Sequence, residues 1–239
     1  MRGQYVFNPP YLILGLNLTI IGGIDFIVAY LSAKGYLLTG SLTLLLITLS
    51  FVSSAILGIM NGIFANFSSN WAVTAAAFGL LLFSVLQIFA SFQGSFRSAP
   101  IGSENRKVRL TLVCSAAVFI SLFLSLLVWL NVFPTFFVNG VGVTVFDQIV
   151  YSVVIFLFAL NCVLFLRLYL KSKANVLYWY TLALALDTIG LYGLTLQVRY
   201  YDIVVWTARL GVYIATIYFL IALLSSRKSN KEAENLPEI

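Results

Sequence analysis

Three ionisable residues, Asp25, Asp187 and Arg209, lie inside long apolar stretches of the 239-residue sequence. A charged side chain at the centre of a bilayer costs about 2.5–3.5 kcal/mol on insertion scales, so such residues must be paired, hydrated or neutral. Arg209 and Asp187 fall on consecutive antiparallel stretches, at depths that let the arginine reach down to the carboxylate. The sequence therefore predicts an Asp187–Arg209 pair, which either lines a binding site or only fixes the register of two helices.

Asp25 has no second buried cation with which to pair. With two carboxyls and one guanidinium, the predicted cluster is one positive charge short. We therefore expect one of the two aspartates to be protonated at neutral pH, or to hold a cation or a polar ligand.

Two polar helical faces surround these charges. On the last apolar stretch, residues recur at spacings of four and three, which places them on one face. The stretch before it repeats this spacing from Tyr180 to Gln197. Such faces form either a polar core or the wall of a pocket that opens outward. The residues that we predict to bind a ligand are Asp25, Phe137, Asp187, Asp202, Trp206, Arg209 and Tyr213.

The elements that must hold these residues are membrane-spanning helices. Of the residues, 61% are hydrophobic and 9% charged, and the long runs do not alternate as the strands of a barrel do. One crossing needs roughly 20 apolar residues. The stretches that meet this length are 11–33, 39–64, 71–92, 110–132, 145–170, 176–198 and 203–224. We expect an all-α integral membrane protein, a seven-transmembrane-helix bundle over residues 1–224, with a short polar cytoplasmic tail at 225–239.

The positions of Lys and Arg predict the orientation of the bundle. Most of the 14 basic residues fall in the loops on one side and in the C-terminal tail, and cytoplasmic loops retain such residues. We therefore expect the N-terminus outside, the C-terminus in the cytoplasm and a multi-pass protein of the cell membrane. The net charge of +6 then reflects topology, so the lipid bilayer is the expected partner and nucleic acid is not.

Several classes of cofactor and enzyme are excluded by residue type. The chain has no histidine, which excludes His-ligated haem, most zinc sites and the usual base of serine or thiol catalysis. Stretch 203–224 contains no lysine, so a retinal Schiff base is excluded. Cys114 and Cys162 show no metal or redox spacing. We expect no cofactor, no metal and no enzymatic activity.

A glycine-broken aromatic segment, FPTFFVNGVGVTVFD at 133–147, joins the fourth and fifth stretches. Pro134 ends the preceding helix, and Gly140 and Gly142 permit a tight turn. Its phenylalanines are too apolar for a free loop in water. We expect the segment to fold back as a lid over the charged helices.

This segment also resembles a family signature. It is similar to "FP…FVEGVGLTPFK" of the third class of membrane-associated sensor (MASE) domains, with matches at Phe133-Pro134, Phe137-Val138, Gly140-Val141-Gly142 and Thr144. Around Asp25, IGGIDFIVAYLSAKG resembles the family's "GLIDLLHTLAYKG". Two further stretches, ALDTIGLYGL and DIVVWTARL, resemble family stretches that place an acidic residue at Asp187 and a basic one at Arg209.

The resemblance implies a seven-span sensor that passes a signal to a histidine kinase or diguanylate cyclase. Two histidines of the family fall on Val28 and Trp206 here. The resemblance therefore implies no chemistry that depends on those imidazoles in this chain. No output domain is recognisable in the sequence. The resemblance therefore leads us to expect either an excised module or a sensor that acts through a partner protein.

We expect a sensory or ligand-binding membrane module. It would recognise a small molecule or ion in an outward-facing pocket and relay the signal through its last helix to a cytoplasmic domain or partner. A small transporter or channel is an alternative, because intramembrane carboxyls also mark ion paths. A non-catalytic subunit of a membrane complex and a homodimer are also left open.

Overall fold

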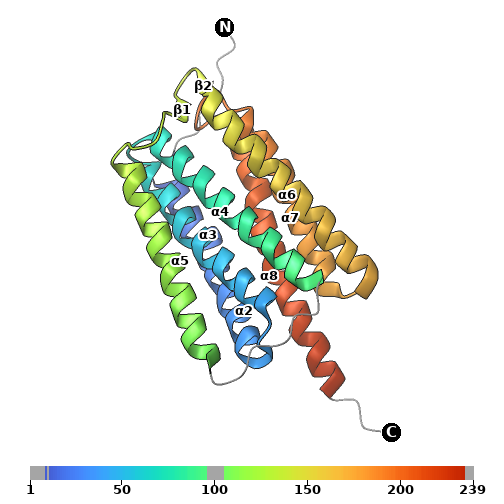
Figure 1. Cartoon of the computed structure of the whole chain (residues 1–239). Helices are drawn as coiled ribbons and strands as arrows, with labels where there is room; N and C mark the ends of the chain where they lie inside the picture. Colours follow the sequence, from blue (N-terminus) through green and yellow to red (C-terminus); the bar gives the residue numbers. More distant parts are fainter. Residues whose placement is uncertain (1–8, 10, 96–104, 235–239) are drawn as a thin grey trace.

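The computed structural model describes residues 9, 11–95 and 105–234 as a bundle of long helices that lie side by side (Figure 1). One end of the bundle carries a small β-hairpin, and we call it the hairpin end; the opposite end is the far end. The helical elements are α1 (Leu12–Leu16), η1 (Asn17–Ile24), α2 (Asp25–Thr39), α3 (Leu42–Phe64), α4 (Ser69–Ser95), α5 (Arg106–Trp129), α6 (Val145–Ser172), α7 (Asn175–Thr195) and α8 (Ile203–Glu234). The strands β1 (Phe137–Val138) and β2 (Gly142–Val143) pair antiparallel.

Within the described residues, six helical stretches are long and apolar enough to cross a membrane. They are Leu12–Thr39, Leu42–Phe64, Ser69–Gly94, Arg106–Trp129, Val145–Ser172 and Ile203–Ser225. The prediction of an all-α membrane bundle is confirmed. Each predicted stretch corresponds to a helix, but the 21-residue α7 is not among these six. It carries Asp187 and a Tyr-Trp-Tyr run, which reduce its apolar character.

The first crossing is not the uniform α-helix that its sequence predicts. Residues Asn17–Ile24 form a π-helix between α1 and α2, a geometry that is frequent at functional sites. The Asn17 side chain, inside this π-helix, donates hydrogen bonds to the Gly58 carbonyl at 3.0 Å and to Asn61 Oδ1 at 2.7 Å. These bonds hold the π-helix against α3.

Glycines set the closest approaches between helices. A Cβ at Gly190 of α7 would lie 2.9 Å from the Ala208 carbonyl oxygen of α8, so the two backbones touch there. A Cβ at Gly58 would lie 2.5 Å from Ile21 Cγ2, and one at Gly62 3.0 Å from the Leu14 Cα atom. These glycines of α3 therefore let it pack closely against the first crossing.

An aromatic core fills the middle of the bundle. Its rings come from α3, α4, α6, α7 and α8 and lie edge-on or stacked, with centroids 4.8–5.9 Å apart. Such pairs add about 0.5–1.5 kcal/mol each beyond the burial of their area. The members of this aromatic core are Phe51, Phe83, Phe158, Tyr180 and Phe219.

The last helix extends beyond its predicted end. Helix α8 continues without interruption to Glu234, so residues 225–234 of the predicted tail are helical. Residues 235–239 of that tail, and residues 96–104 of the loop between α4 and α5, lie outside the described residues. Figure 1 shows α8 reaching past the other helices at the far end.

Candidate functional site

A cavity of about 110 Å³ lies between the aromatic core and the hairpin end. A single water molecule needs only ~10–15 Å³ measured in this way, so the cavity has room for several waters or a small ligand. Its walls come from η1, α2, α3, α4, α6, α7 and α8, together with the segment that joins α7 to α8. Four of the predicted ligand-binding residues line it: Asp25, Asp187, Arg209 and Tyr213.

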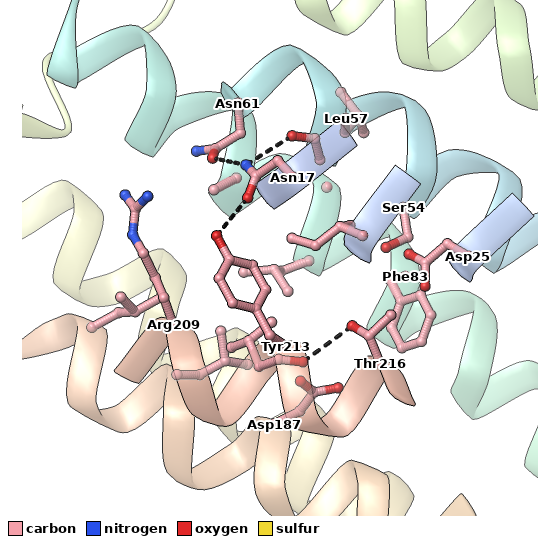
Figure 2. A pocket seen from close by; sticks show the side chains of 18 of the residues that line it. Asn17, Asp25, Ser54, Leu57, Asn61, Phe83, Asp187, Arg209, Tyr213 and Thr216 are labelled. Atoms are coloured by element: carbon pink, nitrogen blue, oxygen red, sulfur yellow. Dashed lines mark hydrogen bonds between the residues drawn. The ribbon is translucent and has the colours of Figure 1, made fainter. Parts of the chain in front are cut away.

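The two carboxyl groups lie at the end of the cavity near the aromatic core. Asp25 is 3% exposed and Asp187 is 6% exposed. Ser54 lies beside Asp25, and Thr216 projects between the two aspartates (Figure 2). Asp187 receives no hydrogen bond from any described residue. The cavity therefore ends in an acidic region with one carboxyl group that has no protein partner.

Arg209 does not pair with Asp187, so the prediction of that pair is wrong. Figure 2 shows the guanidinium pointing away from the Asp187 carboxyl. It lies 4.5 Å from the ring centroid of Tyr200 and 5.9 Å from that of Trp206. In the described part of the chain, no carboxylate lies within 4.0 Å of it.

The reason for this difference is the direction in which helical side chains lean. Each Cα–Cβ bond tilts toward the N-terminus of its own helix. Arg209 on α8 therefore leans toward the hairpin end, whereas Asp187 on the antiparallel α7 leans toward the far end. The depth of the Cα atoms alone suggested a contact that these opposite tilts prevent.

A chain of buried polar side chains lines the cavity between the two charged regions. The Tyr213 hydroxyl donates to Asn17 Oδ1 at 2.9 Å, and Asn17 donates to Asn61 Oδ1 at 2.7 Å. Asn61 in turn donates to the Ala72 carbonyl at 2.7 Å. These bonds join α8, η1, α3 and α4. Asn17 and Asn61 are not among the predicted ligand-binding residues, although an amide within an apolar helix is itself a signal of such a network.

The rest of the cavity wall is mostly aliphatic. It presents no charge between the acidic region and Arg209, which makes the middle of the cavity suited to methylene groups. The aliphatic lining residues are Ile21, Leu57, Val73, Ala76, Leu80, Leu191, Leu194 and Val212.

The aromatic core closes the cavity toward the far end. Phe51, Phe83, Phe158 and Phe219 all contribute to its lining. Behind them, the Tyr180 hydroxyl donates to Gln87 Oε1 at 2.7 Å, and Gln87 Nε2 donates to Ser50 Oγ at 2.7 Å. Tyr180, Gln87 and Ser50 thus form one hydrogen-bonded chain below the cavity.

The predicted lid is a β-hairpin docked on the segment between α7 and α8. Its tight turn has Gly140 at φ 90° and Gly142 at φ 108°, as expected from the two glycines. The Gly140 amide donates to the Val198 carbonyl at 3.2 Å. Phe137 is buried, and its ring meets that of Tyr200 edge-on at 6.2 Å. Because Tyr200 lines the cavity, the hairpin covers a wall of the site rather than entering it.

Three predicted residues lie beside the cavity rather than in its lining. Phe137 supports Tyr200, and Trp206 lies near the guanidinium of Arg209. Asp202 caps α8, because its Oδ1 accepts the Val205 amide at 2.9 Å. A helix cap of this kind explains the aspartate without a ligand.

Asp147 was not predicted as a site residue, yet it is fully buried. It lies in the first turn of α6, and both of its carboxyl oxygens lack a hydrogen-bond partner among the described residues. The buried Tyr200 hydroxyl lacks a partner as well. In the sequence Asp147 stands at the end of an apolar stretch, where an acidic residue is ordinarily exposed at the interface.

A second hollow of about 310 Å³ also has Tyr200 in its lining. It is lined by Asn139, Gly140, Arg199, Tyr200 and Tyr201. Burial raises the pKa of the Tyr201 phenol above its usual value, and its hydroxyl donates to the Ala65 carbonyl at 2.9 Å. Tyr200 therefore contributes to both this hollow and the cavity.

No protein-family model matches the chain, and neither a curated protein nor a solved structure does. Among the described residues there is no cluster of three or more Cys, Asp or Glu side chains that could hold a metal ion.

Proposed function

We propose that the protein is a membrane-embedded sensory module that binds a small molecule or ion in the cavity. The observation that carries this proposal is a buried cavity with unpaired charged groups at both ends. Charged groups inside a membrane protein are costly and ordinarily pair with one another or serve function. Here Asp187 and Arg209 share one cavity and do not pair. A ligand that contacts them would supply the missing partners.

In this proposal α7 also crosses the membrane, which gives seven crossings with the hairpin end outside and the C-terminus in the cytoplasm. A 21-residue helix is about 31 Å long, close to the ~30 Å of a bilayer core. It runs between α6 and α8, which are both candidate crossings. Basic residues at the far end, such as Lys171 and Lys173, support a cytoplasmic far end.

Helix α8 is the proposed route of the signal. Arg209, Tyr213 and Thr216 on one of its faces line the cavity, and the same helix continues to Glu234 at the far end. A shift of this helix at the ligand would therefore reach the far end without a flexible joint. The resemblance to the third class of MASE domains favours a histidine kinase, a cyclase or another membrane protein as the receiver.

The proposal is tested by binding and by movement of α8. The full chain in lipid nanodiscs is exposed to a panel of small amines, carboxylates and zwitterions, and spin labels at Ser172 and Ser225 report the distance between α6 and α8. We expect one class of probe to raise thermal stability and change this distance, and Arg209→Ala to abolish both effects while the bundle stays folded. An unaltered response in that variant would defeat the assignment.

A transporter is the second candidate, and one observation favours it. The chain of hydrogen bonds from Tyr180 through Gln87 to Ser50 carries polar groups into the aromatic core below the two aspartates. Such a chain could extend an ion or proton path. Flux of the bound probe or of protons into sealed proteoliposomes distinguishes the two functions, because a sensor binds without transport.

A further inference from the structure

The geometry points to a ligand class: we propose that the cavity takes an extended zwitterion, with its ammonium group near Asp25 and Asp187 and its carboxylate at Arg209. This inference rests on the proposed ligand-binding function and adds the chemistry of the ligand. An unbranched ω-amino acid is the simplest molecule of this class.

Opposite charges lie apart within one cavity. Asp25 and Asp187 are 3% and 6% exposed at one end, and Arg209 is 9% exposed toward the other. Figure 2 shows the guanidinium directed away from both carboxyl groups. A ligand with a single charge would satisfy one end and leave the other unpaired in a low-dielectric site.

The length of the cavity selects an extended ligand. Arg209 and Thr216, which lies between the two aspartates (Figure 2), are on one face of α8. Their seven-residue separation places their Cα atoms about 10 Å apart along the helix axis, and the guanidinium lies farther from Thr216 because the Arg209 side chain leans toward the hairpin end. An α-amino acid carries both charges on one carbon and cannot reach across. An extended chain of six carbons spans about 8 Å between its ends, and a hydrogen bond at each end brings the span to about 14 Å, which fits this longer separation.

The wall between the two ends suits methylene groups. Much of its lining is aliphatic, with Leu57, Leu80, Leu191, Leu194 and Val212 among its members, beside the hydrogen-bonded side chains of Tyr213 and Asn17. Each methylene group of an extended ligand that is buried against these side chains should tighten binding by up to about fourfold. The phenol rings of Tyr200 and Tyr213 also lie along this path.

The balance of charge also fits a zwitterion when one of the two aspartates is protonated. The cavity then holds one carboxylate at one end and one guanidinium at the other, and a zwitterion meets each with the opposite charge while adding no net charge. The ammonium group of the ligand enters the end that has the carboxyl groups. Its carboxylate meets Arg209, whose planar guanidinium can bind both oxygens at once.

The experiment uses the full chain in nanodiscs and isothermal titration with unbranched ω-amino acids of two to seven carbons. The controls are the alkylamine and the alkyl carboxylate of each length. We expect affinity to rise with length to a maximum at about five to seven carbons. The singly charged analogues of the best length should bind at least about tenfold more weakly.

Two variants assign the ends of the ligand. Arg209→Gln should weaken binding of the zwitterion about tenfold or more and leave the alkylamine unchanged. Asp187→Asn should weaken the zwitterion and the alkylamine alike. The matched controls are Arg167→Gln, an exposed arginine, and Asp147→Asn, a buried aspartate that is not in the cavity lining; both should bind as the parent does.

Some outcomes overturn the ligand class. The ligand class is wrong if binding does not depend on chain length, if singly charged analogues bind as tightly as the zwitterion, or if no member of the series binds. If the zwitterion binds as expected but the α6–α8 distance stays unchanged, the ligand class stands and the signalling proposal falls. If probes outside this class move α8 through Arg209, the signalling proposal stands and the ligand class falls.

Discussion

The cavity and the aromatic core occupy adjacent levels of the same helices, and they differ in how their groups are satisfied. In the core, rings meet rings, and the buried Gln87 is bonded at both ends of its amide. In the cavity, Asp187 and Arg209 have no ionic partner among the described residues. The core is therefore organised for stability, whereas the cavity retains unpaired charges that packing alone would not select. This contrast implies that core variants should change folding and cavity variants should change binding.

The largest effect is expected in the aromatic core. Phe83→Ala removes a ring that packs on Phe51, Phe158 and Phe219, and such truncations cost about 3–5 kcal/mol. The control is Phe123→Ala on α5, whose side chain is 48% exposed toward the bundle exterior. Reversible unfolding in mixed micelles measures the free energy of each variant. Equal losses for both would contradict the role of the core.

A smaller loss is expected where α7 meets α8. Gly190→Ala places a methyl group 2.9 Å from the Ala208 carbonyl oxygen, and overpacking of this kind costs about 1–3 kcal/mol. Gly15→Ala is the control, because no atom lies within 4 Å of the added methyl group. Both free energies of unfolding come from the same micelle assay. A Gly190 variant as stable as the Gly15 variant would show that the two helices can separate freely.

The smallest effect on stability is expected inside the cavity. Tyr213→Phe leaves Asn17 Oδ1 without the hydroxyl that donates to it at 2.9 Å, at a cost of about 1 kcal/mol. Binding of the ω-amino acid probes should weaken in this variant as well, because the polar chain shapes the site. Tyr192→Phe on α7, 61% exposed, should change neither quantity. A stability loss in Tyr213→Phe as large as that of Phe83→Ala would remove the distinction between the two regions.

The positions of the helices could be predicted because the hydropathy of each stretch depends only on the residue types within it. The four cavity residues Asp25, Asp187, Arg209 and Tyr213 could be predicted because charge and spacing are visible in the sequence. The side chains that these residues contact could not be predicted. The tilt of side chains along antiparallel helices decides that Arg209 meets Tyr200 rather than Asp187.

Other features depend on contacts between residues far apart in the chain. The π-helix at Asn17–Ile24 and the bond from Tyr213 to Asn17 need α3 and α8 to lie beside the first crossing. The burial of Asp147 depends on the elements packed around the first turn of α6, which the apolar pattern does not specify. The sequence shows Gly190 and Ala208 only as small residues, and it does not show that the backbones of α7 and α8 approach each other there.

The most direct test of the account is access to the cavity from each side of the membrane. Thr216→Cys places a thiol among the cavity lining, and Ala222→Cys places one on the same helix beyond Phe219. Both are made with Cys114 and Cys162 replaced by alanine, in sealed vesicles treated with a small membrane-impermeant thiol reagent. We predict that Thr216→Cys reacts only from the hairpin side, that a bound ω-amino acid slows this reaction, and that Ala222→Cys does not react. Reaction of Thr216→Cys from the far side, or from neither side, would contradict an outward-facing binding cavity.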